Sequence, residues 1–156
     1  METVLTLNLK KAKELYPTAD PALKALLEQN FGKKKLSKNI LDVIDGLDAV
    51  YAYHNIDRFK FEMNMKDLSK DTQAYEVLKL IVAAYNEGNP PEYTNGDVKK
   101  WYPVFRTVSG FGFSNATYAY GYTYTRVGSR LAFREEAHAE AAGRLFEKVY
   151  EAYYMP

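Results

Sequence analysis

Glu135 and His138 are the two residues whose types and spacing come closest to a reactive site. A spacing of three residues puts both side chains on one face of a helix, as in one half of a di-metal site in a helix bundle. A complete site needs a second such pair, but the other histidine, His54, follows Tyr51 at this spacing, and tyrosine cannot replace a bridging carboxylate. We therefore expect no metal ion and no cofactor. We expect Glu135 and His138 to form an exposed polar turn where a helix begins, because acidic residues are favoured there.

The nucleophilic residues do not form a catalytic set. The chain has no cysteine, and Ser109, Ser114 and Ser129 do not stand in the pattern of a nucleophile elbow. Gly110 and Gly112 are not followed by the Lys-Ser/Thr pair that ends a phosphate-binding loop. The sequence consequently favours a non-enzymatic function.

Four alternating tyrosines form the candidate binding surface: Tyr118, Tyr120, Tyr122 and Tyr124. On a strand they project to the same side, and a large exposed aromatic patch usually marks a contact site. We expect this surface to meet protein, either the chain's own helices, another subunit of a homo-oligomer or a protein partner. The alternative is a stacking platform for single-stranded nucleic acid.

The overall charge argues against the nucleic-acid alternative. The chain carries 21 Lys and Arg against 20 Asp and Glu, a formal net charge of +1, whereas nucleic-acid binders normally have a basic excess. The cluster at residues 33–35, with Lys38, is expected to be solvated surface. Because no apolar run reaches the roughly 20 residues of a membrane span and no secretory signal is present, we expect a soluble protein in the bacterial cytoplasm or the virion, with no membrane partner.

The pattern of residues 1–88 predicts a mainly helical part of the chain. Asp20 and Pro21 are a helix-start signal, and Gly32 is a stop signal. The expected elements are a short β-prone segment at 4–9, a helix at 21–31, two short helices capped by Ser37 and Asp45, and a long helix at 71–87.

Residues 89–156 predict a small antiparallel, aromatic-rich sheet closed by a helix. The expected strands are 100–108, 113–125 and 130–134, and the expected helix is 135–154. Ala137 and Leu145 belong to the apolar stripe of that helix, and we expect Leu145 to be buried against the sheet. The fold class is therefore α+β, in a single domain covering residues 1–156.

Three strings in this second part occur together in a known order: KWYPVF at 100–105, SGFGF at 109–113 and VGSRLAF at 127–133. With the helix around 139–146, they resemble a family of small proteins of uncharacterised function from Bacteroides-type gut bacteria, their phages and integrated mobile elements. The resemblance implies a phage or mobile-element context and carries over no functional residues. Ala132 stands where similar sequences often have cysteine. Together with the motifs above, this predicts a binding or structural accessory protein.

Overall fold

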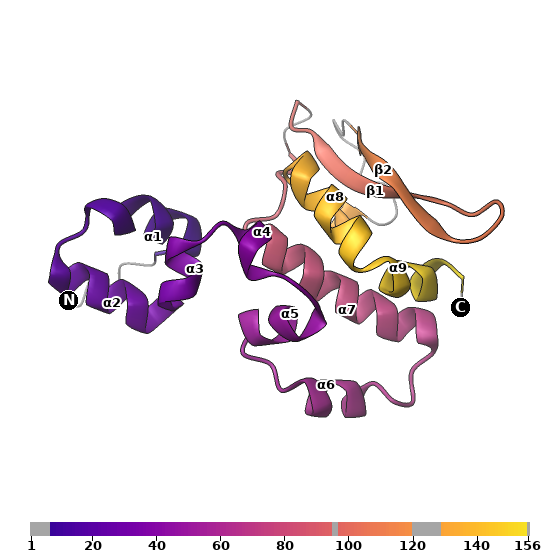
Figure 1. Ribbon diagram of the computed structural model, residues 1–156, viewed down its shortest axis with the longest axis horizontal. Coiled ribbons are helices and arrows are strands. Elements are labelled where there is room, and N and C mark those ends of the chain that lie inside the picture. The colour runs from indigo at the N-terminus through magenta and orange to yellow at the C-terminus, as the bar shows by residue number, and fades with distance from the viewer. Residues whose placement is uncertain (1–6, 95–96, 120–128, 156) are drawn as a thin grey trace.

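The computed structural model describes residues 7–94, 97–119 and 129–155. An N-terminal lobe (residues 7–37) is joined to a main body (residues 40–155) through Lys38 and Asn39 (Figure 1). The lobe contains α1 (Leu9–Leu15), a 3-10 turn η1 (Tyr16–Thr18), α2 (Pro21–Phe31) and α3 (Lys33–Ser37). The helical elements of the main body are α4 (Ile40–Val43), α5 (Leu47–Tyr53), α6 (Arg58–Asn64), α7 (Lys70–Tyr85), η2 (Ser129–Leu131), α8 (Glu136–Leu145) and α9 (Glu147–Tyr154), and its strands are β1 (Lys100–Arg106) and β2 (Gly112–Ala119).

Capping residues define the helices of the lobe. Asn8 accepts a hydrogen bond from the Lys11 backbone at 2.9 Å, and Asp20 accepts one from the Leu23 backbone at 2.8 Å. Such caps satisfy N–H groups that the helix itself leaves without acceptors. Gly32 ends α2 with φ of +82°, in the region that favours glycine. The lobe has its own small core, made of Ala12, Leu27 and Leu36.

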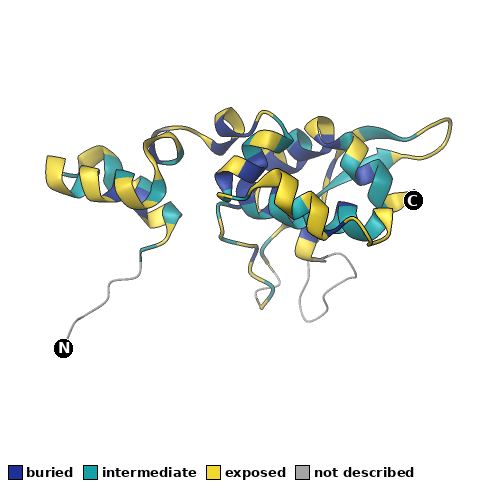
Figure 2. Cartoon of the chain, turned by 90° about the horizontal axis from the view of Figure 1, so that it is seen from below, coloured by how far each residue is buried: buried dark blue, intermediate teal, exposed yellow. Residues whose placement is uncertain are grey.

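The main body is built around α7, which lies between α4 and α5 on one side and α8 and α9 on the other (Figure 1). The burial pattern in Figure 2 places the buried residues at this centre. Leu78, Ile81 and Tyr85 of α7 are completely or almost completely buried. Together with residues of α5, α8 and α9 they form the larger of the two cores, so the long helix expected at 71–87 is the central support of the fold.

The two strands form an antiparallel hairpin that packs on α8 (Figure 1). The register pairs Trp101 with Tyr118 and Pro103 with Ala116, and an irregularity between Val104 and Phe105 leaves one extra residue on β2. Trp101 also exchanges two backbone hydrogen bonds with Phe133, of 2.9 and 2.8 Å. The segment after η2 is therefore tied to the outer edge of β1.

A glycine allows the hairpin to approach α8 closely. A Cβ atom at Gly143 would lie 2.3 Å from two ring carbons of Phe113 and 2.8 Å from Cβ of Pro103. The guanidinium of Arg144 covers the same Phe113 ring, 4.9 Å from its centroid. Glu147 of α9 accepts a hydrogen bond from the Phe113 backbone at 2.8 Å. The hairpin is thus held by both C-terminal helices.

The α+β class is confirmed, with an antiparallel aromatic hairpin and C-terminal helices. The strand expected at 130–134 is wrong: residues 129–131 form a 3-10 turn, followed by the single Trp101–Phe133 bridge. Leu131 and Phe133 still point inward and are buried. One backbone bridge and two buried side chains produce the same apolar alternation as a short strand.

The expected helix at 135–154 is two helices, because the backbone leaves the helical region at Phe146. Phe146 and Tyr150 are buried, whereas Leu145 is 44% exposed, so the expectation that Leu145 is buried is wrong. Ala137 is also exposed, whereas Ala142 of the expected stripe is buried. Because Ala142, Phe146 and Tyr150 follow one another at spacings of four, one buried face continues across the break, and the expected stripe is displaced from it.

The start of the chain also differs from the expectation. Leu9 begins α1 because Asn8 caps that helix, so the β-prone segment does not reach it; residues 4–6 lie outside the described residues. Ser37 is still part of α3, and the cap of α4 falls on Asn39. Gly46, not Asp45, precedes α5. No helix among the described residues has the length and apolar character needed to cross a bilayer.

Candidate functional site

The candidate tyrosines are only partly within the described residues. The backbone of Tyr118 belongs to β2, where it pairs with Trp101. The side chain of Tyr118, and the whole of Tyr120, Tyr122 and Tyr124, lie outside the described residues. Two other surfaces can be built from described side chains: an aromatic groove beside the hairpin and a polar cleft between the lobe and the main body.

The aromatic groove is a hollow of about 520 Å³ between the hairpin and the end of α9. Its lining residues are Pro103, Val104, Phe105, Thr107, Phe111, Tyr154 and Met155. None of these side chains carries a charge. Chemically, the groove can accept apolar or aromatic groups, with Thr107 and Tyr154 able to offer hydroxyl groups at its wall.

Phe105 organises the rings of the aromatic groove. Its ring stacks on Phe111 with centroids 4.8 Å apart, and it meets Tyr150 at 4.7 Å and Tyr154 at 6.2 Å. Tyr150 is buried beneath Phe105, and this burial raises the pKa of its hydroxyl. Tyr150 is not a lining residue, and it supports the Phe105 ring from the core side of the groove.

Exposed apolar residues lie in the wall of the aromatic groove and next to it in the sequence. Val108, in the turn between the strands, is 86% exposed, and Tyr154 and Met155 are 56% and 54% exposed. The turn itself contains Ser109 with φ of +67° and Gly110 with φ of +112°. A non-glycine residue held in the left-handed region indicates that the surroundings determine the shape of this turn.

The polar cleft contains Glu135 and His138, and the expectation of an exposed helix start holds for Glu135 but is wrong for His138. His138 is not part of an exposed turn: it is 8% exposed and its ring lies 5.8 Å from that of Tyr85. The start of α8 packs against the end of α7, which covers the imidazole. Burial lowers the pKa of His138, although the nearby carboxylates of Glu135 and Glu87 oppose this effect. The ring is consequently neutral at pH 7.

The hydrogen bonding of His138 is incomplete. Its Nε2 atom lies 3.7 Å from a carboxylate oxygen of Glu135, beyond hydrogen-bond distance. Its Nδ1 atom is buried and has no hydrogen-bond partner among the described residues. Buried polar atoms are rarely left without a partner in folded proteins. This atom is therefore the chemically unexplained feature of the cleft.

The residues at the end of α7 fix the floor of the cleft. The buried side chain of Asn86 donates to the Ala132 carbonyl at 2.9 Å and accepts from the Arg134 backbone at 3.0 Å. The next residue, Glu87, has φ of +52° and forms an ion pair with Lys13 of α1. Lys13 also donates to the Lys38 carbonyl at 3.1 Å. The cleft is thus built from α1, the α7 terminus and the start of α8.

The lysine cluster at 33–35 contributes a second link between the lobe and the main body. Lys33, Lys34 and Lys38 are exposed, as the sequence predicts. Lys35 is half-buried: its ammonium donates to the Tyr53 carbonyl and lies 4.2 Å from the centroid of the Tyr53 ring. Burial lowers the pKa of Lys35. One member of the cluster is therefore structural.

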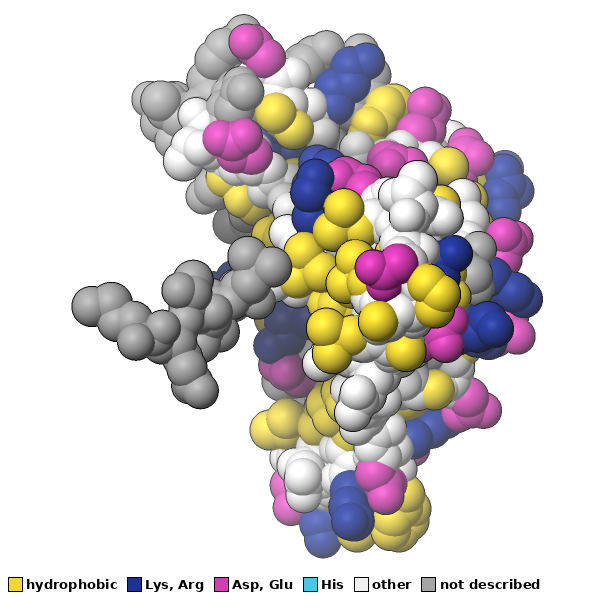
Figure 3. All heavy atoms as spheres, turned by 90° about the vertical axis from the view of Figure 1, so that its left-hand side faces the viewer, with side chains coloured by type: hydrophobic (Ala, Val, Ile, Leu, Met, Phe, Trp, Pro, Cys, Tyr) yellow, Lys and Arg dark blue, Asp and Glu magenta, His cyan; other side chains and the backbone are white. Residues whose placement is uncertain are grey.

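The outer end of the lobe also presents apolar side chains, which gather at the centre of the face in Figure 3 with charged residues around them. Leu26 of α2 is 55% exposed. Leu26 does not line the aromatic groove or the polar cleft. It is therefore a suitable control position for experiments on these two surfaces.

Metal binding is not supported by the described residues, since no three His, Cys, Asp or Glu side chains among them come together as ligands. Comparisons with protein-family models, curated protein sequences and solved structures gave no match. The function of the chain is therefore inferred from the chemistry of the aromatic groove and the polar cleft.

Proposed function

We propose that this chain is a binding protein without catalytic activity, acting as a structural accessory protein that holds an apolar segment of a protein partner in the aromatic groove. The observation that carries the proposal is the groove itself: a hollow of about 520 Å³ with no charged side chain among its described lining residues and with Tyr154 and Met155 exposed in its wall. Ligand-binding pockets commonly have about 300–1,000 Å³ of space and a mostly apolar lining.

The chemistry of the groove favours protein over nucleic acid. Single-stranded nucleic-acid sites combine aromatic side chains with a positively charged track for the phosphates. The groove has the aromatic component, in Phe105, Phe111 and Tyr154, but its lining includes no lysine or arginine. A protein segment needs no such track, because apolar anchors that fill a pocket provide most of the binding free energy.

The resemblance to phage and mobile-element proteins supports the biological setting of this proposal. A small binding protein with an apolar groove suits an assembly in which several proteins must be held together. In that setting the partner is another protein of the same element or its host, or a second copy of this chain. Both possibilities use the same groove, so one crosslinking position tests them.

Photocrosslinking from position 108 tests the proposal directly. Val108, the exposed neighbour of the groove residue Thr107, is replaced by the photoreactive residue benzoylphenylalanine. The protein is irradiated first alone and then in cells of its native host. The matched control carries the same residue at Leu26, which is exposed on the lobe. We expect adducts with protein from position 108 that position 26 does not give.

A charge in the groove provides the second arm of the experiment. Met155→Asp adds a carboxylate at an exposed position, so the fold tolerates it, but an apolar ligand is disfavoured. The adduct from position 108 should disappear in this variant. Adducts that nuclease removes would favour the nucleic-acid alternative, and equal protein adducts from positions 108 and 26 would contradict the proposal.

A further inference from the structure

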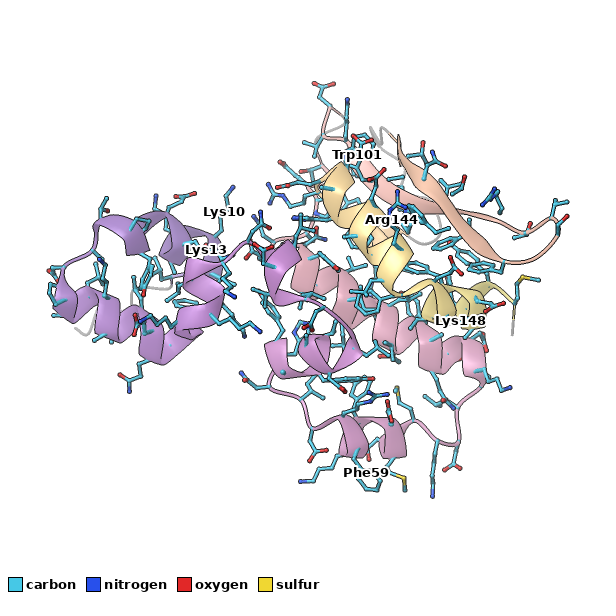
Figure 4. All side chains as sticks on the ribbon, in the orientation of Figure 1. Lys10, Lys13, Phe59, Trp101, Arg144 and Lys148 are labelled. Atoms are coloured by element: carbon cyan, nitrogen blue, oxygen red, sulfur yellow. The ribbon has the colours of Figure 1, made fainter. Side chains whose placement is uncertain are left out.

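We propose that the polar cleft between the N-terminal lobe and the main body binds a small oxyanion of the phosphate class. This proposal concerns a different surface from the aromatic groove and does not depend on the function proposed above. Figure 4 shows Lys10 and Lys13 on the side of the lobe that faces the main body. They lie across the cleft from the start of α8.

The space in the cleft suits a small ligand. Two hollows, of about 120 and 290 Å³, share three lining residues: Glu87, Glu135 and His138. The smaller also includes Lys10 and Arg134, and the larger includes Lys13 and Lys38. A phosphate or sulfate ion fits beside His138, whereas a bulky ligand would have to extend out of the cleft. His138 lines both hollows, although only a small part of its surface is exposed.

The charges around the cleft are unbalanced in favour of an anion. Its lining contains four cationic side chains against two carboxylates, and one carboxylate, Glu87, is already paired with Lys13. The ammonium groups of Lys10 and Lys38 have no acceptor among the described residues. The guanidinium of Arg134 makes one long contact, 3.4 Å to the Asn89 carbonyl. An anion would give these cations the partner they lack.

The unpartnered nitrogen of His138 is the independent observation that points to a ligand. Nδ1 is buried, and no described residue accepts or donates a hydrogen bond there. Because Nδ1 is closed to solvent, the ring must move slightly before an oxyanion in the cleft can accept a hydrogen bond from its N–H, and that bond removes the cost of leaving a buried polar atom unsatisfied. The ring stands in the first turn of α8, whose N-cap residue makes no side-chain capping bond. The positive end of that helix dipole adds to the attraction.

The backbone of Glu87 explains how the cationic side of the cleft is held. Its φ of +52° is uncommon for a residue other than glycine. In this conformation its carboxylate pairs with Lys13, which ties α1 to the α7 terminus. Lys10 is one helical turn before Lys13 on α1, so the same tie keeps Lys10 facing the cleft. The ion pair therefore positions cations that do not themselves contact Glu87.

Imidazole NMR measures occupancy of the cleft, because the chain has two histidines and each gives its own resonances. His54 is the internal control: its Nε2 atom already contacts the Leu80 carbonyl at 2.8 Å. Sodium sulfate is added at pH 7 to the full chain, with sodium chloride of equal ionic strength as the reference. We expect sulfate to shift the His138 resonances selectively, with a dissociation constant of about 1–10 mM.

Two neighbouring lysines on α1 give a matched pair of variants. Lys10→Ala should weaken sulfate binding by about tenfold, as expected for the loss of one charge-assisted contact. Lys11→Ala should leave it unchanged, since Lys11 pairs with Glu14 and does not line the cleft. Both positions are exposed, so both variants should fold. An equal effect of Lys10→Ala and Lys11→Ala would overturn the proposal, because it would show attraction by net charge alone.

The protonation of His138 provides a further readout. A bound anion favours the imidazolium form, so 20 mM sulfate should raise the pKa of His138 and leave that of His54 unchanged. The charges that already face the ring are Glu135 from its own helix, Glu87 from α7 and Lys13 from α1. These charges are present in both the sulfate and the chloride titration, so the difference between the two pKa values of His138 reports the bound anion. Identical His138 titrations in sulfate and chloride would contradict binding beside the ring.

Discussion

The contact between Gly143 and the hairpin predicts that Gly143→Ala destabilises the protein. An alanine Cβ would lie 2.3 Å from carbons of the Phe113 ring and 2.8 Å from Cβ of Pro103, whereas carbon atoms in favourable contact are about 3.5–4.0 Å apart. The Phe113 ring would have to move by more than about 1 Å. The guanidinium of Arg144 contacts the ring, and the hydrogen bond from the Phe113 backbone to Glu147 holds the residue in place. The Phe113 ring therefore cannot move away from the new methyl group without losing one of these contacts.

Two effects of opposite sign determine how much Gly143→Ala changes the free energy of unfolding. Alanine is favoured over glycine inside a helix by about 1 kcal/mol, and overpacking a well-packed contact costs typically about 1–3 kcal/mol. Because both neighbours of the new methyl group are constrained, the upper half of the overpacking range applies. We expect a net loss of about 1–2 kcal/mol in the free energy of unfolding. For a chain of this length that corresponds to a fall of roughly 2–8 °C in Tm.

Urea unfolding followed by circular dichroism measures this loss. Ala137→Gly, at an exposed position of the same helix, reports the intrinsic helix preference without a collision and should lose about 1 kcal/mol. A double-mutant cycle with Phe113→Ala supplies the decisive term: removing the ring should allow alanine at position 143, so the two changes should be strongly non-additive. If Gly143→Ala instead raises stability by about 1 kcal/mol, the close approach of α8 and the hairpin is wrong.

Three further predictions concern the C-terminal helices and the cleft. Phe146→Ala should lower the free energy of unfolding by about 3–5 kcal/mol in urea, because its side chain is buried. Leu145→Ala, at an exposed position, should lower it by less than about 0.5 kcal/mol. Equal losses would show that the buried face of these helices is assigned wrongly. Asn86→Ala should cost about 2–3 kcal/mol, since it leaves a buried carbonyl and a partly buried N–H without partners, and an unchanged urea midpoint would contradict this. Burial lowers the pKa of His138 and of His54 below the value of 6.5 expected for the unfolded chain, so the unfolded state binds more protons as pH falls below that value. Stability should therefore be full above pH 6.5 and should decline as pH is lowered towards the folded pKa values, and His138→Gln should reduce this decline.

Local signals account for the parts of the fold that the sequence predicts correctly. Asp20 and Gly32 bound α2 because a cap and a left-handed stop act on adjacent backbone groups. The helix at 71–87 is found because its apolar spacing is uninterrupted over four turns. Strand β1 is found despite Pro103, whose missing N–H does not prevent pairing with β2. In the two helices the determining contacts lie within a few residues of one another, whereas β1 is indicated by its apolar and aromatic residues alone and is completed by pairing with β2.

The errors arise where distant contacts decide the outcome. Leu145 and Phe146 are apolar neighbours, and only packing against the rest of the core decides that Phe146 is buried and Leu145 exposed. No proline marks the break between α8 and α9. Likewise, Glu135 and His138 form an ordinary helix start until the terminus of α7 covers the imidazole. Lys13 and Glu87 are 74 positions apart, and neither carries a local signal. The ion pair between them could not be predicted from spacing.

The two proposed surfaces lie near opposite ends of the C-terminal helices. The ten residues of α8 span about 15 Å, with His138 in the first turn and the break at Phe146 just after the last. After that break α9 packs against β2, and Tyr154 at its end lines the aromatic groove. Each surface also needs residues from other parts of the chain: the cleft needs α1 and α7, and the groove needs both strands. Truncation would therefore remove the support of a site together with its ligand contacts, so the two activities can be separated only by point substitutions in the full chain.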